Sequence, residues 1–160
     1  MEPEHFIASL VQPVAPRQGL IVNGNVDRPL VLCADTLRAL PTRRIEFAST
    51  CLSGAVGAAR SYRGVALTTL VEAARPSVDR HDDCRRLVIV AEAEDGYRAL
   101  FSWAELFHTP LGDGVFVAFD CDDAPLNTRE GHFVLVSLMD EVTGPRHVRA
   151  LSRIVVQRVF

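Results

Sequence analysis

Hydrophobic residues in this chain are gathered in short runs, and several runs alternate with polar positions. In residues 44–49, Ile45 and Phe47 share one face with Ser49, and residues 151–159 alternate in the same way. Side chains of a strand point to opposite faces in turn, so this period of two predicts strands with one buried face. We expect strands over residues 20–22, 30–33, 44–49, 87–93, 97–101, 115–119, 133–138 and 151–159.

Helical patterns are fewer and shorter than strand patterns. They predict helices over residues 35–40, 67–74 and 103–107, the first ended by Pro41 and the last capped by Ser102. The pairs Asn23-Gly24 and Asp95-Gly96 are typical of turns between strands. Because short strands outnumber helices and do not alternate regularly with them, the pattern favours an α+β, mostly β fold with mixed sheets over a doubly wound sheet.

Length and composition fit one globular domain. The chain has 160 residues, 48% of them hydrophobic, which is enough for a substantial core but cramped for two domains. Residues 1–18 lack periodicity and carry several prolines, so they predict an extended N-terminal arm, followed by a single domain over 19–160. The formal charge of -3 argues against a general nucleic-acid binder.

All 17 cationic residues are arginine, since the chain contains no lysine. This excludes Schiff-base chemistry and a P-loop lysine, and it leaves arginine, histidine and backbone amides to recognise anions. The four cysteines show no Cys-x-x-Cys spacing, which argues against a zinc or iron–sulfur site. With neither a signal peptide nor a membrane-length apolar stretch, we predict a cytoplasmic protein with reduced thiols and no membrane partner. The oligomeric state is left open.

Two segments carry candidate chemistry. Cys51 falls at or just past the end of a predicted strand, and a thiolate is a soft metal ligand, although most unpaired cysteines are packed as small apolar residues. In the segment 144–149, a glycine is followed by Arg146, His147 and Arg149. Residues three apart share one side of a helical turn, so the two arginines are expected to converge on an anion while His147 points elsewhere. The alternative is a solvated loop leading into the last strand.

These segments resemble the oxidoreductase molybdopterin-binding domain, the catalytic domain of the sulfite oxidase family. The family pattern Gly-Ala-Arg-x-Val-Lys-x-Leu is matched by residues 144–151, and Cys51 takes the place of the family's ligand cysteine. Shorter pieces at 62–67, 95–97 and 122–126 are also similar, so the resemblance covers residues 19–159.

The resemblance implies a sulfite oxidase-type fold and a molybdopterin cofactor that carries out oxygen-atom or electron transfer, with a separate electron-transfer partner. It implies that Cys51 ligates molybdenum in a loop shaped by Ser53 and Gly54, and that Tyr97 lines the pocket. The residues it implies for the cofactor phosphate are Gly144, Arg146, His147 and Arg149.

The chain also departs from the family pattern. Only fifty residues precede Cys51, the strand arginine expected at Phe133 is missing, and Pro145 replaces an alanine with a residue that has no amide donor. These departures predict a shallow, open pocket with weak or absent cofactor binding. The alternative function is a non-catalytic binding or interaction module on the same fold, holding a small anionic ligand or a protein partner.

Overall fold

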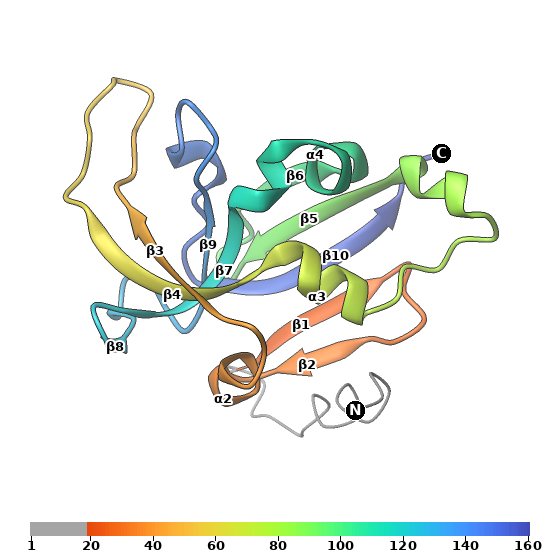
Figure 1. The fold of residues 1–160 in the computed structure, drawn as a ribbon, viewed down its shortest axis with the longest axis horizontal. Coiled ribbons are helices and arrows are strands. Elements are labelled where there is room, and N and C mark those ends of the chain that lie inside the picture. The colour runs from red at the N-terminus through yellow and green to blue at the C-terminus, as the bar shows by residue number, and fades with distance from the viewer. Residues whose placement is uncertain (1–18) are drawn as a thin grey trace.

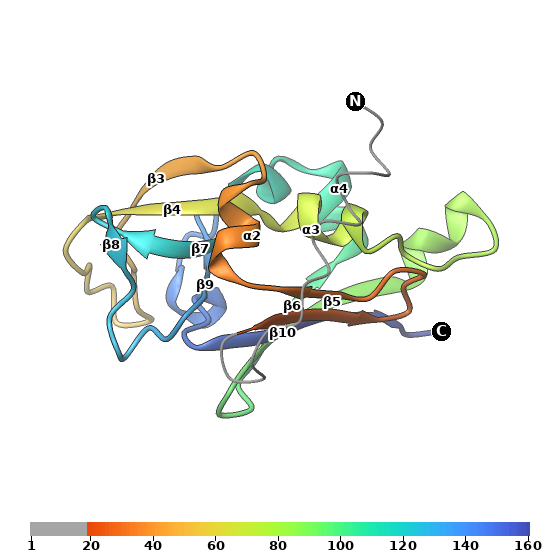
Figure 2. The ribbon, with the colours of Figure 1, turned by 90° about the horizontal axis from the view of Figure 1, so that it is seen from below.

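The computed structural model describes residues 19–160, so the arm predicted for residues 1–18 lies outside the described residues. The described chain forms two five-stranded sheets connected by short helices (Figure 1). Seen from below, β3, β4 and β7 form one layer and β1, β5 and β10 form the other (Figure 2). This architecture confirms the prediction of an α+β, mostly β fold.

The first sheet has the strand order β2-β1-β10-β5-β6. Its strands are β1 (Leu20–Gly24), β2 (Leu30–Leu32), β5 (Leu87–Ala93), β6 (Arg98–Ser102) and β10 (Leu151–Arg158). β1 runs parallel to β10 and the other pairs are antiparallel, so the sheet is mixed. Gly24 is required at the end of β1, because its φ is +101° and an added Cβ would lie 2.2 Å from the Val156 oxygen.

The second sheet has the order β3-β4-β7-β8, and β9 also pairs with β7. Its strands are β3 (Arg43–Phe47), β4 (Arg60–Ala66), β7 (Val115–Cys121), β8 (Ala124–Pro125) and β9 (Val134–Ser137). The sequence pattern did not predict β4 or β8. In addition, β3 ends at Phe47, so Cys51 lies four residues beyond the strand, in the loop formed by residues 48–59.

The helices are short. They are α2 (Ala34–Arg38), α3 (Leu67–Ala73) and α4 (Trp103–His108), with the 3₁₀ helices η1 (His81–Arg86), η2 (Pro110–Gly114) and η3 (Gly144–Arg146). Ser102 caps α4 as predicted, in a capping box with Glu105. The polar segment of residues 76–85 contains most of η1. Within residues 19–160, no helix has the length and apolar character needed to cross a membrane.

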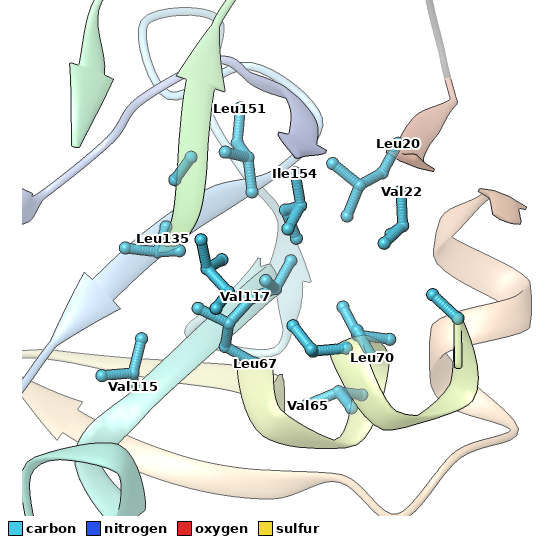
Figure 3. Packing of buried hydrophobic residues seen from close by; sticks show 14 of the residues in the cluster. Leu20, Val22, Val65, Leu67, Leu70, Val115, Val117, Leu135, Leu151 and Ile154 are labelled. Atoms are coloured by element: carbon cyan, nitrogen blue, oxygen red, sulfur yellow. The ribbon is translucent and has the colours of Figure 1, made fainter. Parts of the chain in front are cut away.

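The main core lies between the two sheets and includes the apolar face of α3. Leu67 and Leu70 of α3 point toward Val117 of β7 and Ile154 of β10, and all four side chains are fully buried (Figure 3). A smaller apolar cluster, which includes Phe47 and Tyr62, forms separately from this core in the second sheet. Burial of these two apolar clusters stabilises the strands, and the loops that connect the strands project from this stable framework.

Two of these loops lie side by side at one end of the molecule. The loop of residues 48–59 joins β3 to β4, the segment that contains η3 joins β9 to β10, and the two lie next to each other (Figure 1). Their backbones are joined, because the Gly144 amide donates a hydrogen bond to the Thr50 oxygen at 2.9 Å. The fold therefore brings together the two segments that carry the candidate chemistry, nearly one hundred residues apart in the sequence.

Candidate functional site

A hollow of about 600 Å³ separates the Cys51 loop from η3. It is lined by Ser49, Cys51, Leu52, Ser53, Tyr97, Gly144, Pro145, His147 and Arg149. Six of the eight predicted site residues line this hollow, Gly54 lies in the turn just after Ser53, and the exception is Arg146. Cys51 is exposed, and the fold places it beside the glycine-and-arginine segment.

Cys51 is exposed, and its sulfur lies 2.8 Å from the Ser53 hydroxyl oxygen. This side-chain hydrogen bond, followed by backbone interactions of Ser53, lowers the pKa of the Cys51 thiol. Gly54 closes the turn with a φ of +83°, and its amide donates to the Cys51 oxygen at 2.9 Å. Ser53 and Gly54 therefore shape the loop around an accessible sulfur, and the Ser53 hydroxyl beside it favours the thiolate form.

The opposite wall approaches Cys51 closely because residue 144 is glycine. A Cβ added to Gly144 would lie 3.1 Å from the Thr50 oxygen and 3.6 Å from the Cys51 Cα. Above it, the Tyr97 hydroxyl donates to the Pro145 carbonyl oxygen, and the half-exposed Tyr97 ring lines the hollow. Tyr97 follows the Asp95-Gly96 turn, so the turn between β5 and β6 delivers it to this place.

Arg146 does not reach the hollow, and the predicted convergence of Arg146 and Arg149 is wrong. The Arg146 Nε donates to Asp140 Oδ2 at 2.8 Å, and a second guanidinium nitrogen bonds the other carboxylate oxygen. Its third nitrogen lies 3.4 Å from Glu105, and the guanidinium stacks 4.5 Å from the Phe101 ring centroid. Two carboxylates and an aromatic face outcompete an external anion for this side chain.

Arg149 does line the hollow and is exposed. Within residues 19–160 it makes no ion pair. The next residue, Ala150, has a φ of +49°, which is unusual for a residue with a side chain and turns the chain sharply into β10. Arg149 is therefore the guanidinium of this segment that is available to an anion.

His147 also lines the hollow, contrary to the expectation that it points elsewhere. Its ring packs edge-on against Phe47 with centroids 5.2 Å apart, and both ring nitrogens are buried with no hydrogen-bond partner among residues 19–160. Burial, reinforced by the positive charge of Arg149, lowers the pKa of His147 to about 4. The ring is therefore neutral at physiological pH.

A buried carboxylate beside this hollow was missed by sequence reasoning. The Tyr62 hydroxyl donates to one oxygen of Glu130 at 2.7 Å, and Arg60 donates to the other at 2.8 Å. Burial, and then the bond to Glu130, raises the pKa of Tyr62. These residues line a second hollow of about 200 Å³ that also includes His147 and Arg149. Nothing in the spacing of Arg60, Tyr62 and Glu130 along the chain signals their contact.

The donor set fits a group that brings both a metal and a phosphate. Cys51 is the single cysteine that lines the hollow, and residues 19–160 contain no cluster of three or more His, Cys, Asp or Glu side chains able to hold a metal ion. Residues 19–160 therefore do not supply a complete ligand set for a metal at Cys51, and a non-protein group can supply the other ligands. A pterin with sulfur ligands and a phosphate meets that requirement, with Arg149 as the cationic partner.

Comparisons with known proteins agree with this chemistry. Residues 12–159 match the family described as the oxidoreductase molybdopterin binding domain. Among solved structures, the sulfane dehydrogenase SoxCD from Paracoccus pantotrophus is similar with a TM-score of 0.65 and 16% sequence identity, over 92% of this chain and 40% of that chain. At this identity the likeness concerns the fold, and this chain spans well under half the length of the SoxCD chain. No curated protein matches the sequence.

Proposed function

Because this chain belongs to the oxidoreductase molybdopterin-binding domain family, we propose that it holds a molybdopterin cofactor in the hollow between the Cys51 loop and η3. The observation that carries the proposal is the pairing, in one cavity, of an exposed thiol with a lowered pKa and an arginine without an ion-pair partner in the described chain. When bound, the cofactor supplies the oxidoreductase chemistry, an oxygen-atom or electron transfer.

Cys51 is the proposed metal ligand. Ligation requires the thiolate, and the hydrogen bond from Ser53 favours that form by placing a donor against the sulfur. The exposure of Cys51 leaves its sulfur open to a metal delivered from the solvent side. The hydrogen bonds within the loop hold this sulfur toward the hollow before any metal arrives.

Arg149 is the proposed phosphate partner, and Tyr97 and Gly144 bound the space beside it. His147 adds no positive charge at neutral pH, but its ring nitrogens, which have no hydrogen-bond partner among residues 19–160, can hydrogen-bond a polar ligand. Since Arg146 is engaged by Asp140, one guanidinium of this segment faces the phosphate instead of two. Each charge-assisted hydrogen bond contributes roughly 1.5 to 3 kcal/mol, so losing one such bond is expected to lower the affinity about 10- to 150-fold relative to a two-arginine site.

We also propose a separate electron-transfer partner, because the sequence shows no motif for binding a haem or a flavin. The alternative function is a non-catalytic module that uses the same hollow for a small anion or a protein segment. The ion pair between Arg146 and Asp140 removes a possible phosphate partner, and this favours the alternative.

The test is expression in a host that makes molybdopterin, followed by measurement of molybdenum and of pterin released from the purified protein. Because binding is predicted to be weak, we expect substoichiometric molybdenum and pterin in the wild type, loss of molybdenum in Cys51→Ser, and wild-type content in the matched control Cys33→Ser. Arg149→Ala is expected to lower the pterin content. Equal molybdenum in wild type and Cys51→Ser would refute the ligand role, and a wild type without pterin would favour the binding module.

A further inference from the structure

Apart from its covalent links to β3 and β4, the Cys51 loop is hydrogen-bonded to the rest of the described protein through one residue. Within residues 48–59, the hydrogen bonds of Cys51, Gly54 and Gly57 are made to other residues of the same loop. Two hydrogen bonds connect this loop to other parts of residues 19–160, and the backbone of Thr50 makes both of them. The position of Cys51 therefore depends on what holds Thr50.

Thr50 is held on both sides by the segment that leads into η3. Its amide donates to the Thr143 hydroxyl oxygen at 2.7 Å, and its carbonyl accepts from the Gly144 amide at 2.9 Å. Thr143 is buried, with 6% of its surface exposed, so this hydroxyl is shielded from competition by water. Because Thr50 immediately precedes Cys51, the two bonds determine where the cysteine backbone begins.

Arg146 anchors the segment that provides these bonds. Besides its bonds to Asp140, it lies against Glu105 and Phe101, and one nitrogen donates to the Leu100 oxygen at 3.3 Å. Glu105 is itself fixed by the capping box at the start of α4. The Arg146 amide in turn bonds the Thr143 oxygen at 3.2 Å. A continuous chain of contacts thus runs from α4 through η3 to Thr50.

We infer that Thr143 and Arg146 are positioning residues for Cys51: Arg146 fixes η3 on β6 and α4, and Thr143 transmits that fixed position to the cysteine loop. This assigns Arg146 a role that differs from holding an anion. The functional importance of the positioning rests on the proposed function of Cys51, whereas the attachment itself is a property of the chain and can be tested without cofactor.

The first test compares Thr143→Val, which keeps the shape and removes the acceptor, with Thr143→Ser, which keeps the hydroxyl. Amide hydrogen exchange followed by NMR is expected to be about 2- to 12-fold faster in Thr143→Val at Thr50 and Cys51, the range that corresponds to one hydrogen bond. Thr143→Ser should restore wild-type exchange. Amides of the central strand β5 should be unchanged in both variants, which separates release of the loop from general destabilisation.

The second test uses Arg146→Met with Arg44→Met as its control, because Arg44 makes an exposed ion pair with Asp123. The amides of Thr50 and Cys51 are expected to exchange faster in Arg146→Met and at the wild-type rate in Arg44→Met. Wild-type exchange at these amides in Thr143→Val, or equal effects of Arg146→Met and Arg44→Met, would overturn the inference.

Molybdenum content separates this inference from the proposed function. In protein from a molybdopterin-producing host, Thr143→Val is expected to retain less molybdenum than wild type and Thr143→Ser is expected to match it. If the wild type holds no molybdenum while Thr143→Val still frees the loop, the proposed function fails and the positioning role stands. If the wild type holds molybdenum and Thr143→Val changes neither exchange nor content, the positioning role fails.

Discussion

Replacing His147 with phenylalanine should remove an acid-sensitive contribution to stability. The unfolded chain binds a proton at His147 near the ordinary pKa of 6.5, whereas the folded protein does so only near pH 4, because the ring is buried against Phe47. A folded-state pKa below the unfolded one means that stability is complete above pH 6.5 and is lost as the pH falls toward 4. Phenylalanine keeps the aromatic contact and has no titrating nitrogen.

The size of the effect follows from the difference between the two pKa values. One pKa unit corresponds to about 1.4 kcal/mol, so the wild type should lose about 2 kcal/mol relative to His147→Phe between pH 7 and pH 5. The loss should approach about 3 kcal/mol at pH 4. Carboxylates and the other histidines titrate in both proteins, and the difference between the two proteins therefore isolates His147.

Urea denaturation between pH 4 and pH 7.5 measures this difference. The chain has a single tryptophan, Trp103, which is 9% exposed and reports unfolding by fluorescence. His108→Gln, which removes an exposed imidazole, is the control for losing a histidine as such. Parallel stability curves for wild type and His147→Phe across this range would refute the account of a buried, neutral ring.

Two further predictions concern Arg146, which lies outside the hollow, and Cys51, which lines it. Arg146→Met should lower the free energy of unfolding, measured in urea, by about 1 to 3 kcal/mol, because it leaves the largely buried carboxylate of Asp140 without its partner. The control Arg44→Met removes an exposed ion pair and should cost under about 1 kcal/mol. Equal losses in the two variants would contradict this prediction. Alkylation of the native protein at pH 7.5, followed by mass spectrometry, should modify the exposed Cys51 well before the buried Cys121. The reason is that burial raises the pKa of Cys121 to about 11. Comparable alkylation rates at the two cysteines would contradict the described environments.

The sequence by itself determined the elements whose pattern is local. Ile45 and Phe47 are buried while the residues between and before them are exposed, as a period of two requires. The Asp95-Gly96 turn and the Ser102 cap also follow from neighbouring residues, because a positive φ and an amide acceptor are needed there whatever the rest of the chain does. The resemblance in residues 144–151 likewise identified the family, which the comparison confirms.

Tertiary structure decided which residues meet. Strand β4 lies between β3 and β7 and lacks a clean alternation, and its Gly64 is needed because a Cβ would lie 2.6 Å from the Val117 oxygen, a neighbour that spacing does not reveal. Arg146 and Arg149 look equivalent in the sequence. They differ in the structure because Asp140 and Glu105 bind the Arg146 guanidinium, whereas Arg149 lines the hollow. Charge attraction acts through space, and only the packing of α4, η3 and the Cys51 loop sets those distances.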